Sequence, residues 1–246
     1  DLLKRIDIHN KFGGRDIDKW MLDIIKLKKG DKILDVGCGA GALMKELEVY
    51  GKVEGIDFSQ TAIDFCKSRG ITAVQISSVE SIPFSDNTFD VVCSFQVIEH
   101  IENYEKFLSE IKRVLKPEGI ALIATPNKKT YSPESEKPLN PFHVKEFYLN
   151  EFKNLLHSYF DEVEMFGVQE GLKIKKINNL SEKPSYKKIS KLSKKINLPF
   201  IKKIIFKKIK ILIFRNYYKN INVSDFEITK LDLDNVLDFI GVCKKI

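Results

Sequence analysis

The chain has 246 residues, of which 43% are hydrophobic and 11% aromatic, so it is long enough to bury one α/β core with an insertion. Its apolar runs are broken by lysines before they reach membrane-spanning length. The net charge of +7 is uneven, because residues 172–220 hold 16 basic residues and one acidic residue, whereas the remainder holds 25 basic and 33 acidic residues. We therefore expect an acidic body that carries one basic segment, not a uniformly basic protein.

The four cysteines, Cys38, Cys66, Cys93 and Cys243, show no CxxC spacing, and three of them lie in apolar, strand-like runs. Buried free thiols are expected from this pattern, in place of disulfides or metal ligands. Free thiols, together with the lack of a recognisable signal peptide, predict a cytoplasmic location.

Residues 1–29 open the chain with a predicted helical cap, because apolar residues recur at helix spacing after Asp16. Strand-like runs then alternate with helix-period segments over the predicted core, residues 30–171. The predicted strands are 32–37, 52–59, 71–76, 88–95, 120–127 and 162–169, and the predicted helices are 40–51, 60–70, 103–119 and 144–160. Residues 172–233 interrupt this alternation as a basic helical insertion, and residues 234–246 return to the core with one last strand.

This order predicts an α/β fold: a doubly wound, mostly parallel sheet of seven strands, with a helical N-terminal cap and a helical basic insertion before the last strand. Right-handed crossovers bring the loops that follow the strands to one edge of the sheet. Ligands of such sheets bind at that edge.

A glycine turn follows the first predicted strand in the sequence DVGCGAG, with glycines at 37, 39 and 41. The spacing is GxGxG, which differs from the GxGxxG fingerprint of dinucleotide-binding proteins. Asp35 lies two residues before the first glycine, where a pyrophosphate would meet its carboxylate, whereas an ammonium group would be attracted. Asp57, at the end of the second strand, is placed to accept hydrogen bonds from ribose hydroxyls. Ribose with an ammonium group and no phosphate describes S-adenosylmethionine.

Each of these two carboxylates also has a purely structural interpretation. Asp35 could cap a helix or brace the loop, and Asp57 could be a turn residue ahead of a helix capped by Ser59. A nicotinamide-dependent oxidoreductase is disfavoured by Asp35 and by the glycine spacing.

Five ordered stretches, ILDVGCGAG, VEGIDFS, IPFSDNTFDVV, VIEHIENYEKFLSEIKRVLKPEG and IATPN, resemble the successive motifs of the class I, seven-stranded S-adenosylmethionine-dependent methyltransferases. The resemblance covers residues 30–170 and resumes at 236–246. It implies that the methionine moiety is lined by Asp35, Gly37, Cys38 and Gly39, the ribose is held by Asp57, and the adenine is bracketed by Phe58, Ser77, Ser78 and Val79. It also implies that Phe95 and Gln96 lie near the transferred methyl group. Ser77 stands where the family commonly has an aspartate facing the adenine amino group, which weakens that hydrogen bond.

Two histidines are candidate general bases for an acceptor that must lose a proton. His100 follows the fourth strand, and His143 lies in the loop after the fifth strand, in the sequence NPFHVKEF. Each could instead have a local structural role, His100 at a helix start and His143 as the cap of the next helix. We rank His143 first, because family members with a similar loop use this histidine on the substrate side.

Glu99, His100 and His143 also resemble the metal-binding arrangement of the small-RNA 2′-O-methyltransferases. Gln96 replaces the first glutamate of that arrangement, and an amide is a poor ligand for a hard dication. The sequence therefore predicts that no metal is bound.

The basic segment contains two predicted amphipathic helices between residues 186 and 218. Three interpretations remain open: a lid that packs on the body, a helix pair at the surface of an anionic membrane, and a nucleic-acid contact. Nucleic acid is the least favoured, because aromatic residues interleave poorly with the lysines. A membrane contact would place the protein at the inner membrane face.

The function predicted from these features is methyl transfer from S-adenosylmethionine to an oxygen of a small or lipid-linked acceptor, such as a glycan precursor or a quinone-like compound. One alternative is an RNA methyltransferase, although SFQV stands where base methyltransferases carry an Asn/Asp-Pro-Pro-aromatic motif. A second alternative is a binding protein that keeps the fold without catalysis. The oligomeric state is left open.

Overall fold

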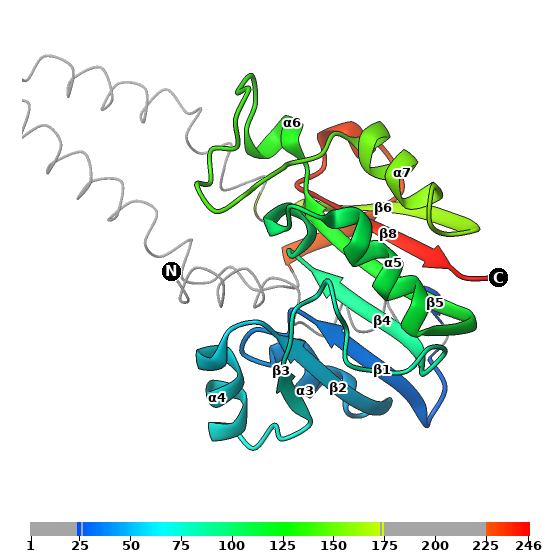
Figure 1. Cartoon of the computed structure of the whole chain (residues 1–246). Coiled ribbons are helices and arrows are strands. Elements are labelled where there is room, and N and C mark those ends of the chain that lie inside the picture. The colour runs from blue at the N-terminus through cyan, green and yellow to red at the C-terminus, as the bar shows by residue number, and fades with distance from the viewer. Residues whose placement is uncertain (1–23, 26, 173, 175–224) are drawn as a thin grey trace, which may run out of the picture. The chain divides into compact units, whose positions relative to one another are not determined.

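The fold is described from a computed structural model, in which residues 24, 25, 27–172, 174 and 225–246 are described (Figure 1). The strands are β1 (Asp31–Val36), β2 (Gly51–Asp57), β3 (Val74–Ile76), β4 (Phe89–Phe95), β5 (Leu115–Pro126), β6 (Glu162–Glu170), β7 (Phe226–Thr229) and β8 (Asp238–Lys244). The α-helices are α3 (Ala42–Leu47), α4 (Gln60–Ser68), α5 (Tyr104–Val114), α6 (Lys128–Tyr131) and α7 (Leu149–His157). Two 3₁₀ turns complete the described elements, η1 (Ile98–His100) and η3 (Leu233–Asn235).

The strands form one sheet in the order β3-β2-β1-β4-β5-β8-β6-β7. β1 pairs in parallel with both β2 and β4, so their carboxyl ends meet at the same edge of the sheet. β8 runs antiparallel between β5 and β6. The central strands are buried along most of their length, as expected for parallel strands that are covered on both faces.

Apolar side chains of α5 and α7 share one core with the sheet, and Figure 1 shows both helices over the β4–β5–β8 part of it. Phe107 of α5, Phe152 of α7 and Phe239 of β8 are all fully buried in this core. α3 packs closely on β2, since a Cβ atom on Gly55 would lie 2.5 Å from Sδ of Met44. The core therefore fixes the strand ends from which the candidate site is built.

The described structure confirms the α/β class and the mostly parallel sheet, but it contains eight strands where the sequence predicted seven. The additional strand is β7, which lies inside the segment predicted to be a helical insertion, residues 172–233. Most of the predicted cap and most of that insertion lie outside the described residues.

Several helix boundaries also differ from the prediction, among them the helix predicted over 40–51, which spans Ala42–Leu47, and two of the differences bear on the site. The helix predicted over 103–119 ends at Val114, and β5 begins at Leu115, because Pro117 disfavours helical angles at the preceding residue. The helix predicted over 144–160 begins only at Leu149, which leaves residues 132–148 as a long connection beside the site.

All four cysteines are free and buried, as predicted. Of the helices in the described ranges, none is long and apolar enough to cross a membrane.

Candidate functional site

The glycine turn links β1 to α3 and is held by a carboxylate from the neighbouring strand. Gly37 has φ 77°, and a Cβ atom there would lie 2.5 Å from Cγ2 of Val97, so only glycine fits this close approach. Asp57 Oδ2 accepts a hydrogen bond from the backbone N–H of Gly39 at 2.9 Å, and its Oδ1 accepts one from Ser59 at 2.8 Å. A carboxylate has about four lone-pair positions, so Asp57 can hold the turn and still accept hydrogen bonds from a ligand.

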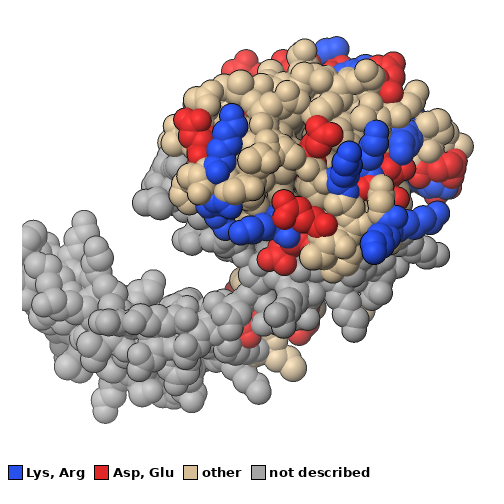
Figure 2. Space-filling model, turned by 90° about the horizontal axis from the view of Figure 1, so that it is seen from below, with Lys and Arg blue, Asp and Glu red and all other residues tan. Residues whose placement is uncertain are grey.

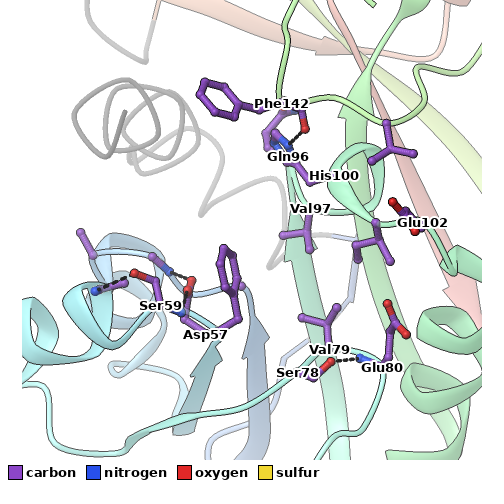
Figure 3. Close-up of a pocket in the computed structure, with 17 residues that line it drawn as sticks. Asp57, Ser59, Ser78, Val79, Glu80, Gln96, Val97, His100, Glu102 and Phe142 are labelled. Carbon is purple, nitrogen blue, oxygen red and sulfur yellow. Dashed lines mark hydrogen bonds between the residues drawn. The ribbon is translucent and has the colours of Figure 1, made fainter.

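A cavity of about 500 Å³ opens beside this turn, within the size range typical of small-molecule sites. Figure 3 shows side chains from four parts of the chain around it: Asp57 and Ser59, then Ser78 to Glu80, then Gln96 and His100, and finally Phe142. Its lining comprises Gly37, Gly39, Ala40, Asp57, Phe58, Ser59, Ala62, Ser78, Val79, Glu80, Gln96, Val97, His100, Ile101, Glu102, Phe142 and Val144.

Most of the residues predicted from the sequence to bind the cofactor line this cavity: Gly37, Gly39, Asp57, Phe58, Ser78, Val79 and Gln96. Asp35, Cys38, Ser77 and Phe95 are not among the lining residues. Of the two candidate bases, His100 lines the cavity, whereas His143, which the sequence ranked first, is buried away from the lining.

Asp35 is buried next to the glycine turn. Burial, and to a lesser extent the nearby carboxylate of Asp57, raises its pKa to about 8. A cationic group brought next to Asp35 would favour its charged form.

The hydroxyl of Ser77 lies 3.1 and 3.0 Å from the backbone oxygens of Ser78 and Ser81, so it is used inside its own loop. A different side chain of this loop, Glu80, lines the cavity. Its carboxylate can accept the hydrogen bond from an amino group that the sequence assigned to Ser77.

Gln96 has a strained backbone at the carboxyl end of β4, with φ 58°. Its N–H donates to the carbonyl of Ala124 at 3.0 Å, and its side-chain amide donates to Asp238 at 3.2 Å. Such strain is concentrated at functional sites, and here it turns the chain from β4 into the cavity wall.

Opposite the glycine turn, His100 and the connection before α7 form a second polar region. Nδ1 of His100 lies 2.8 Å from the carbonyl oxygen of Phe142, and Nδ1 of His143 lies 2.8 Å from Oε1 of Glu146. The two imidazole rings meet edge to face, with centroids 4.8 Å apart. His143 and Glu146 are both buried, so the pair is shielded from water.

Glu99 lies at the centre of this region and is fully buried. Its Oε2 accepts a hydrogen bond from Thr125 at 3.2 Å, whereas Oε1 has no hydrogen-bond partner among the described residues. A buried polar atom without a partner costs roughly 1–3 kcal/mol. Burial raises the pKa of Glu99 to about 8, so at pH 7 its carboxyl group is largely the neutral acid.

Glu146 and Glu80 were not identified from the sequence. The pairing of His143 with Glu146 does not follow from the helical rule that residues three apart face each other, because α7 begins only at Leu149. No sequence signal marked Glu80, because a single acidic residue in a loop is common and belongs to no recognisable motif. Two exposed phenylalanines, Phe58 and Phe142, also line the cavity.

Comparison with known proteins agrees with this geometry. The family model described as a methyltransferase domain matches residues 34–123, from β1 into β5. The chain carries a class I S-adenosylmethionine-dependent methyltransferase domain.

Two curated relatives of this methyltransferase domain are informative. A probable S-adenosylmethionine-dependent methyltransferase of Mycolicibacterium smegmatis is 36% identical over 137 residues, which are 55% of this chain and 53% of that protein. A ubiquinone biosynthesis O-methyltransferase of Rickettsia conorii is 37% identical over 123 residues, which are 47% of this chain and 41% of that protein. The chain thus spans about half the length, or less, of these relatives.

The fold of the methyltransferase domain recurs in solved structures. A SAM-dependent methyltransferase from Archaeoglobus fulgidus aligns over 100% of both chains with a TM-score of 0.62 and 18% identity. At this identity the likeness bears on the fold alone.

A methyltransferase domain of this kind implies S-adenosylmethionine as the cofactor. The residues present fit it, because the cavity combines a glycine turn that admits close backbone approach, the Asp57 carboxylate and an apolar wall. The described site therefore offers the groups that a sulfonium nucleoside requires.

Proposed function

We propose that this chain transfers a methyl group from S-adenosylmethionine to an oxygen of a small or lipid-linked acceptor, such as a glycan precursor or a quinone-like compound. The observation that carries the proposal is the cavity itself, which joins the glycine turn and Asp57 at one end to His100 and Phe142 at the other. The name of the rickettsial relative, an O-methyltransferase of ubiquinone biosynthesis, supports an oxygen acceptor.

S-Adenosylmethionine supplies an activated methyl group on a sulfonium. The protein mainly has to align the acceptor oxygen, the methyl carbon and the sulfur, and alignment can provide roughly 7–11 kcal/mol of the barrier. In the proposed arrangement, Asp57 holds the ribose hydroxyls, Glu80 accepts a hydrogen bond from the adenine amino group, and the exposed ring of Phe58 covers the base. Asp35 neutralises the ammonium group.

His100 is the titratable group placed to take the proton of an acceptor hydroxyl. Its Nδ1 lies against the Phe142 carbonyl, which can only accept a hydrogen bond, so Nε2 carries the lone pair. The ring of His143 packs edge to face on the ring of His100, and Glu146 holds His143 through Nδ1. Phe142 and Val144, both exposed, give the acceptor side apolar contact surface.

The proposal is tested by titrating the full chain with S-adenosylmethionine and with NAD in a calorimeter. Binding of the first and none of the second is expected. Transfer of a labelled methyl group is then measured with a panel of catechols, quinols and sugar hydroxyls. Asp64→Asn, on the exposed side of α4, is the matched control for changes at Asp57. Preference for NAD, or methylation only of nitrogen or of RNA, would contradict the proposal.

A membrane contact through residues 186–218 remains a separate proposal, because that segment lies outside the described residues. Co-sedimentation of the full chain with anionic and with neutral vesicles tests it, and equal recovery with both would argue against lipid headgroups as the partner.

A further inference from the structure

The acceptor end of the cavity is mostly apolar, and its largest apolar side chain is an exposed phenylalanine ring. Phe142 is 61% exposed and Val144 is 48% exposed, although both line the cavity. Figure 3 shows Phe142 beside Gln96 and His100, away from Asp57 at the cofactor end. Single exposed apolar residues are common on protein surfaces, but two neighbours that line one pocket offer a contact area for a ligand.

The backbone that carries this ring is held on both sides. The carbonyl oxygen of Phe142 accepts a hydrogen bond from Nδ1 of His100 at 2.8 Å, and its N–H donates to Oδ1 of Asn140 at 3.1 Å. Two residues further on, the N–H of Val144 donates to the backbone oxygen of Glu99 at 2.7 Å. The ring is therefore presented from a fixed backbone, which lowers the entropic cost of packing a ligand against it.

The apolar side chains around Phe142 favour one shape of acceptor. Val97, Ile101 and Val144 line this end of the cavity, and their side chains offer no hydrogen-bond donor or acceptor. A sugar carries hydroxyls around its whole ring, and each one buried here without a partner would cost free energy. An aromatic ring presents two apolar faces, and aromatic pairs gain stabilisation beyond the area that they bury. This end therefore suits a flat ring that carries its hydroxyl on one edge.

The charged side chains that line the cavity disfavour an anionic acceptor. Its described lining residues include no lysine or arginine and three carboxylates, those of Asp57, Glu80 and Glu102. Lys145, on the connection beside the site, lies over aromatic rings, with Nζ 4.9 Å from the ring centre of Phe147. Glu102 directly follows Ile101 and is exposed, so a phosphate or carboxylate on the acceptor would meet a like charge there.

We propose that Phe142 selects a flat, uncharged ring alcohol as the acceptor, such as a phenol or a quinol, and that Glu102 disfavours acceptors that carry a phosphate or carboxylate. This inference rests on the proposed function and narrows its acceptor, since it favours a quinone-like compound over a glycan precursor. The ring of Phe142 packs on the face of the acceptor ring. Phe142 and Glu102 select and position the acceptor, and they take no part in the transfer of the methyl group or the proton.

The test of Glu102 compares ring alcohols that differ only in a carboxylate. Catechol, hydroquinone and naphthol are paired with protocatechuate, gentisate and hydroxynaphthoate, and labelled methyl transfer by the full chain gives kcat/KM for each. Two like charges about 4 Å apart in water correspond to roughly a fivefold effect, so Glu102→Gln should lower the preference for the uncharged member of each pair by about that factor. The change in preference isolates the charge, because the intrinsic reactivity of the acceptors is the same with both proteins.

The test of Phe142 uses three variants and the same uncharged rings. Phe142→Ala should lower kcat/KM by roughly 10–100-fold, the loss expected when the contact of one large apolar side chain is removed. Phe142→Leu stays apolar without a flat ring and should fall between, whereas Phe142→Tyr keeps the ring and should retain most of the activity. Leu139→Ala is the matched control, because Leu139 is 65% exposed on the same connection and lies outside the cavity lining.

Binding gives a readout that does not depend on turnover. Calorimetry with catechol, hydroquinone and naphthol is performed on the chain loaded with S-adenosylhomocysteine. Phe142→Ala should weaken binding of the rings, and Leu139→Ala should leave it unchanged. A Kd for S-adenosylmethionine within about twofold of the wild type shows that each variant is folded.

Four results would overturn the inference: no binding or methylation of any ring alcohol, a preference for methyl glucoside over the rings, wild-type kcat/KM for the rings in Phe142→Ala, or an unchanged preference between paired rings in Glu102→Gln. Methylation of methyl glucoside in preference to the rings refutes this inference alone, because oxygen is still the acceptor. Ring binding that depends on Phe142, without methyl transfer to any of these oxygens, refutes the proposed function alone.

Discussion

The two ends of the cavity are built in different ways. At the glycine-turn end, Asp57 is held by backbone N–H groups only 2 and 18 residues away in the sequence. At the histidine end, His100 is held by a carbonyl 42 residues away, and Glu99 by a hydroxyl 26 residues away. The first end is thus a property of a strand–turn–helix unit, whereas the second depends on how a long connection returns to the sheet.

This difference separates cofactor binding from acceptor chemistry. Substitutions at the glycine-turn end should change the affinity for S-adenosylmethionine, and substitutions at the histidine end should change turnover. The predictions below test that separation, in decreasing order of expected effect.

His143→Gln should produce the largest effect, a loss of about 10²-fold in kcat with the acceptor that the wild type methylates, because it removes the ring that positions His100 and a misplacement of about 1 Å can cost that much. Glutamine keeps a donor for Glu146 but removes the imidazole that packs on His100. The Kd for S-adenosylmethionine should stay within about twofold. Steady-state kinetics and calorimetry measure the two quantities, with His157→Gln as the control. An equal loss of both would place His143 in the cofactor site and abolish the separation.

Asp57→Asn should weaken binding of S-adenosylmethionine by roughly 10–100-fold. The substitution removes the charge that accepts ribose hydroxyls, and its NH₂ group faces one of the backbone N–H groups of Gly39 and Ser59. Calorimetry is the measurement, and Asp64→Asn is the control on the exposed side of α4. If Asp57→Asn bound S-adenosylmethionine with wild-type affinity, Asp57 would only stabilise the glycine turn. That is the structural interpretation that the sequence left open.

The contrast between the two ends also explains what could be predicted from the sequence. The succession of strands and helices along the chain up to β5, and the positions of Gly37 and Asp57, follow from local patterns, because glycine spacing and strand ends are visible in adjacent residues. Glu146 could not be placed in this way. Its segment reads as the start of a helix, yet residues before Leu149 are non-helical, since Val144 and Lys145 donate to the backbone oxygen of Glu99.

Strand β7 escaped prediction for a related reason. Four residues, Phe226–Thr229, carry too short a pattern to distinguish a strand from the basic segment that precedes them. The end of α5 at Val114 was predictable from Pro117 and was placed too late, because the residues between them, Leu115 and Lys116, fit a helix by propensity.

Binding of S-adenosylmethionine should strengthen from pH 7 towards pH 8, because burial raises the pKa of Asp35 to about 8. Burial and the charge of Asp57 keep Asp35 protonated below that pH, whereas the ammonium group of the cofactor favours the carboxylate. Binding therefore releases a proton, and affinity rises with pH until Asp35 is ionised. Calorimetry in buffers of different ionisation enthalpy measures the proton released.

Asp35→Asn should flatten this pH profile while lowering the affinity at pH 8. Asp35 does not line the cavity, so the profile also tests whether its carboxylate acts on the ligand from behind the turn. A flat profile in the wild type would assign Asp35 to bracing the loop.

Glu110 belongs to neither end, and its replacement should affect stability with the smallest effect on function. Arg113 donates two hydrogen bonds to Glu110, and Ile82 donates a third, which ties α5 to the loop before β4. Basic and acidic side chains are mixed on the face of the molecule that Figure 2 shows. The hydrogen bonds from Arg113 are the main cause that lowers the pKa of Glu110 to about 2, against burial.

The folded-state pKa of Glu110 lies below its ordinary value, so its contribution is present above about pH 4.5 and is lost as the pH falls towards 2. Glu110→Gln should therefore lower the free energy of unfolding at pH 7 by roughly 1.5–3 kcal/mol, as for hydrogen bonds to charged groups, and by progressively less in acid. Urea denaturation at pH 7 and pH 3 measures this, with the exposed Glu105→Gln as control. If Glu110→Gln also shifted the Kd for S-adenosylmethionine several-fold, the position of the loop that carries Ser78 and Glu80 would depend on α5. Cofactor binding would then depend on residues far from the glycine turn, and not only on the local hydrogen bonds of Asp57.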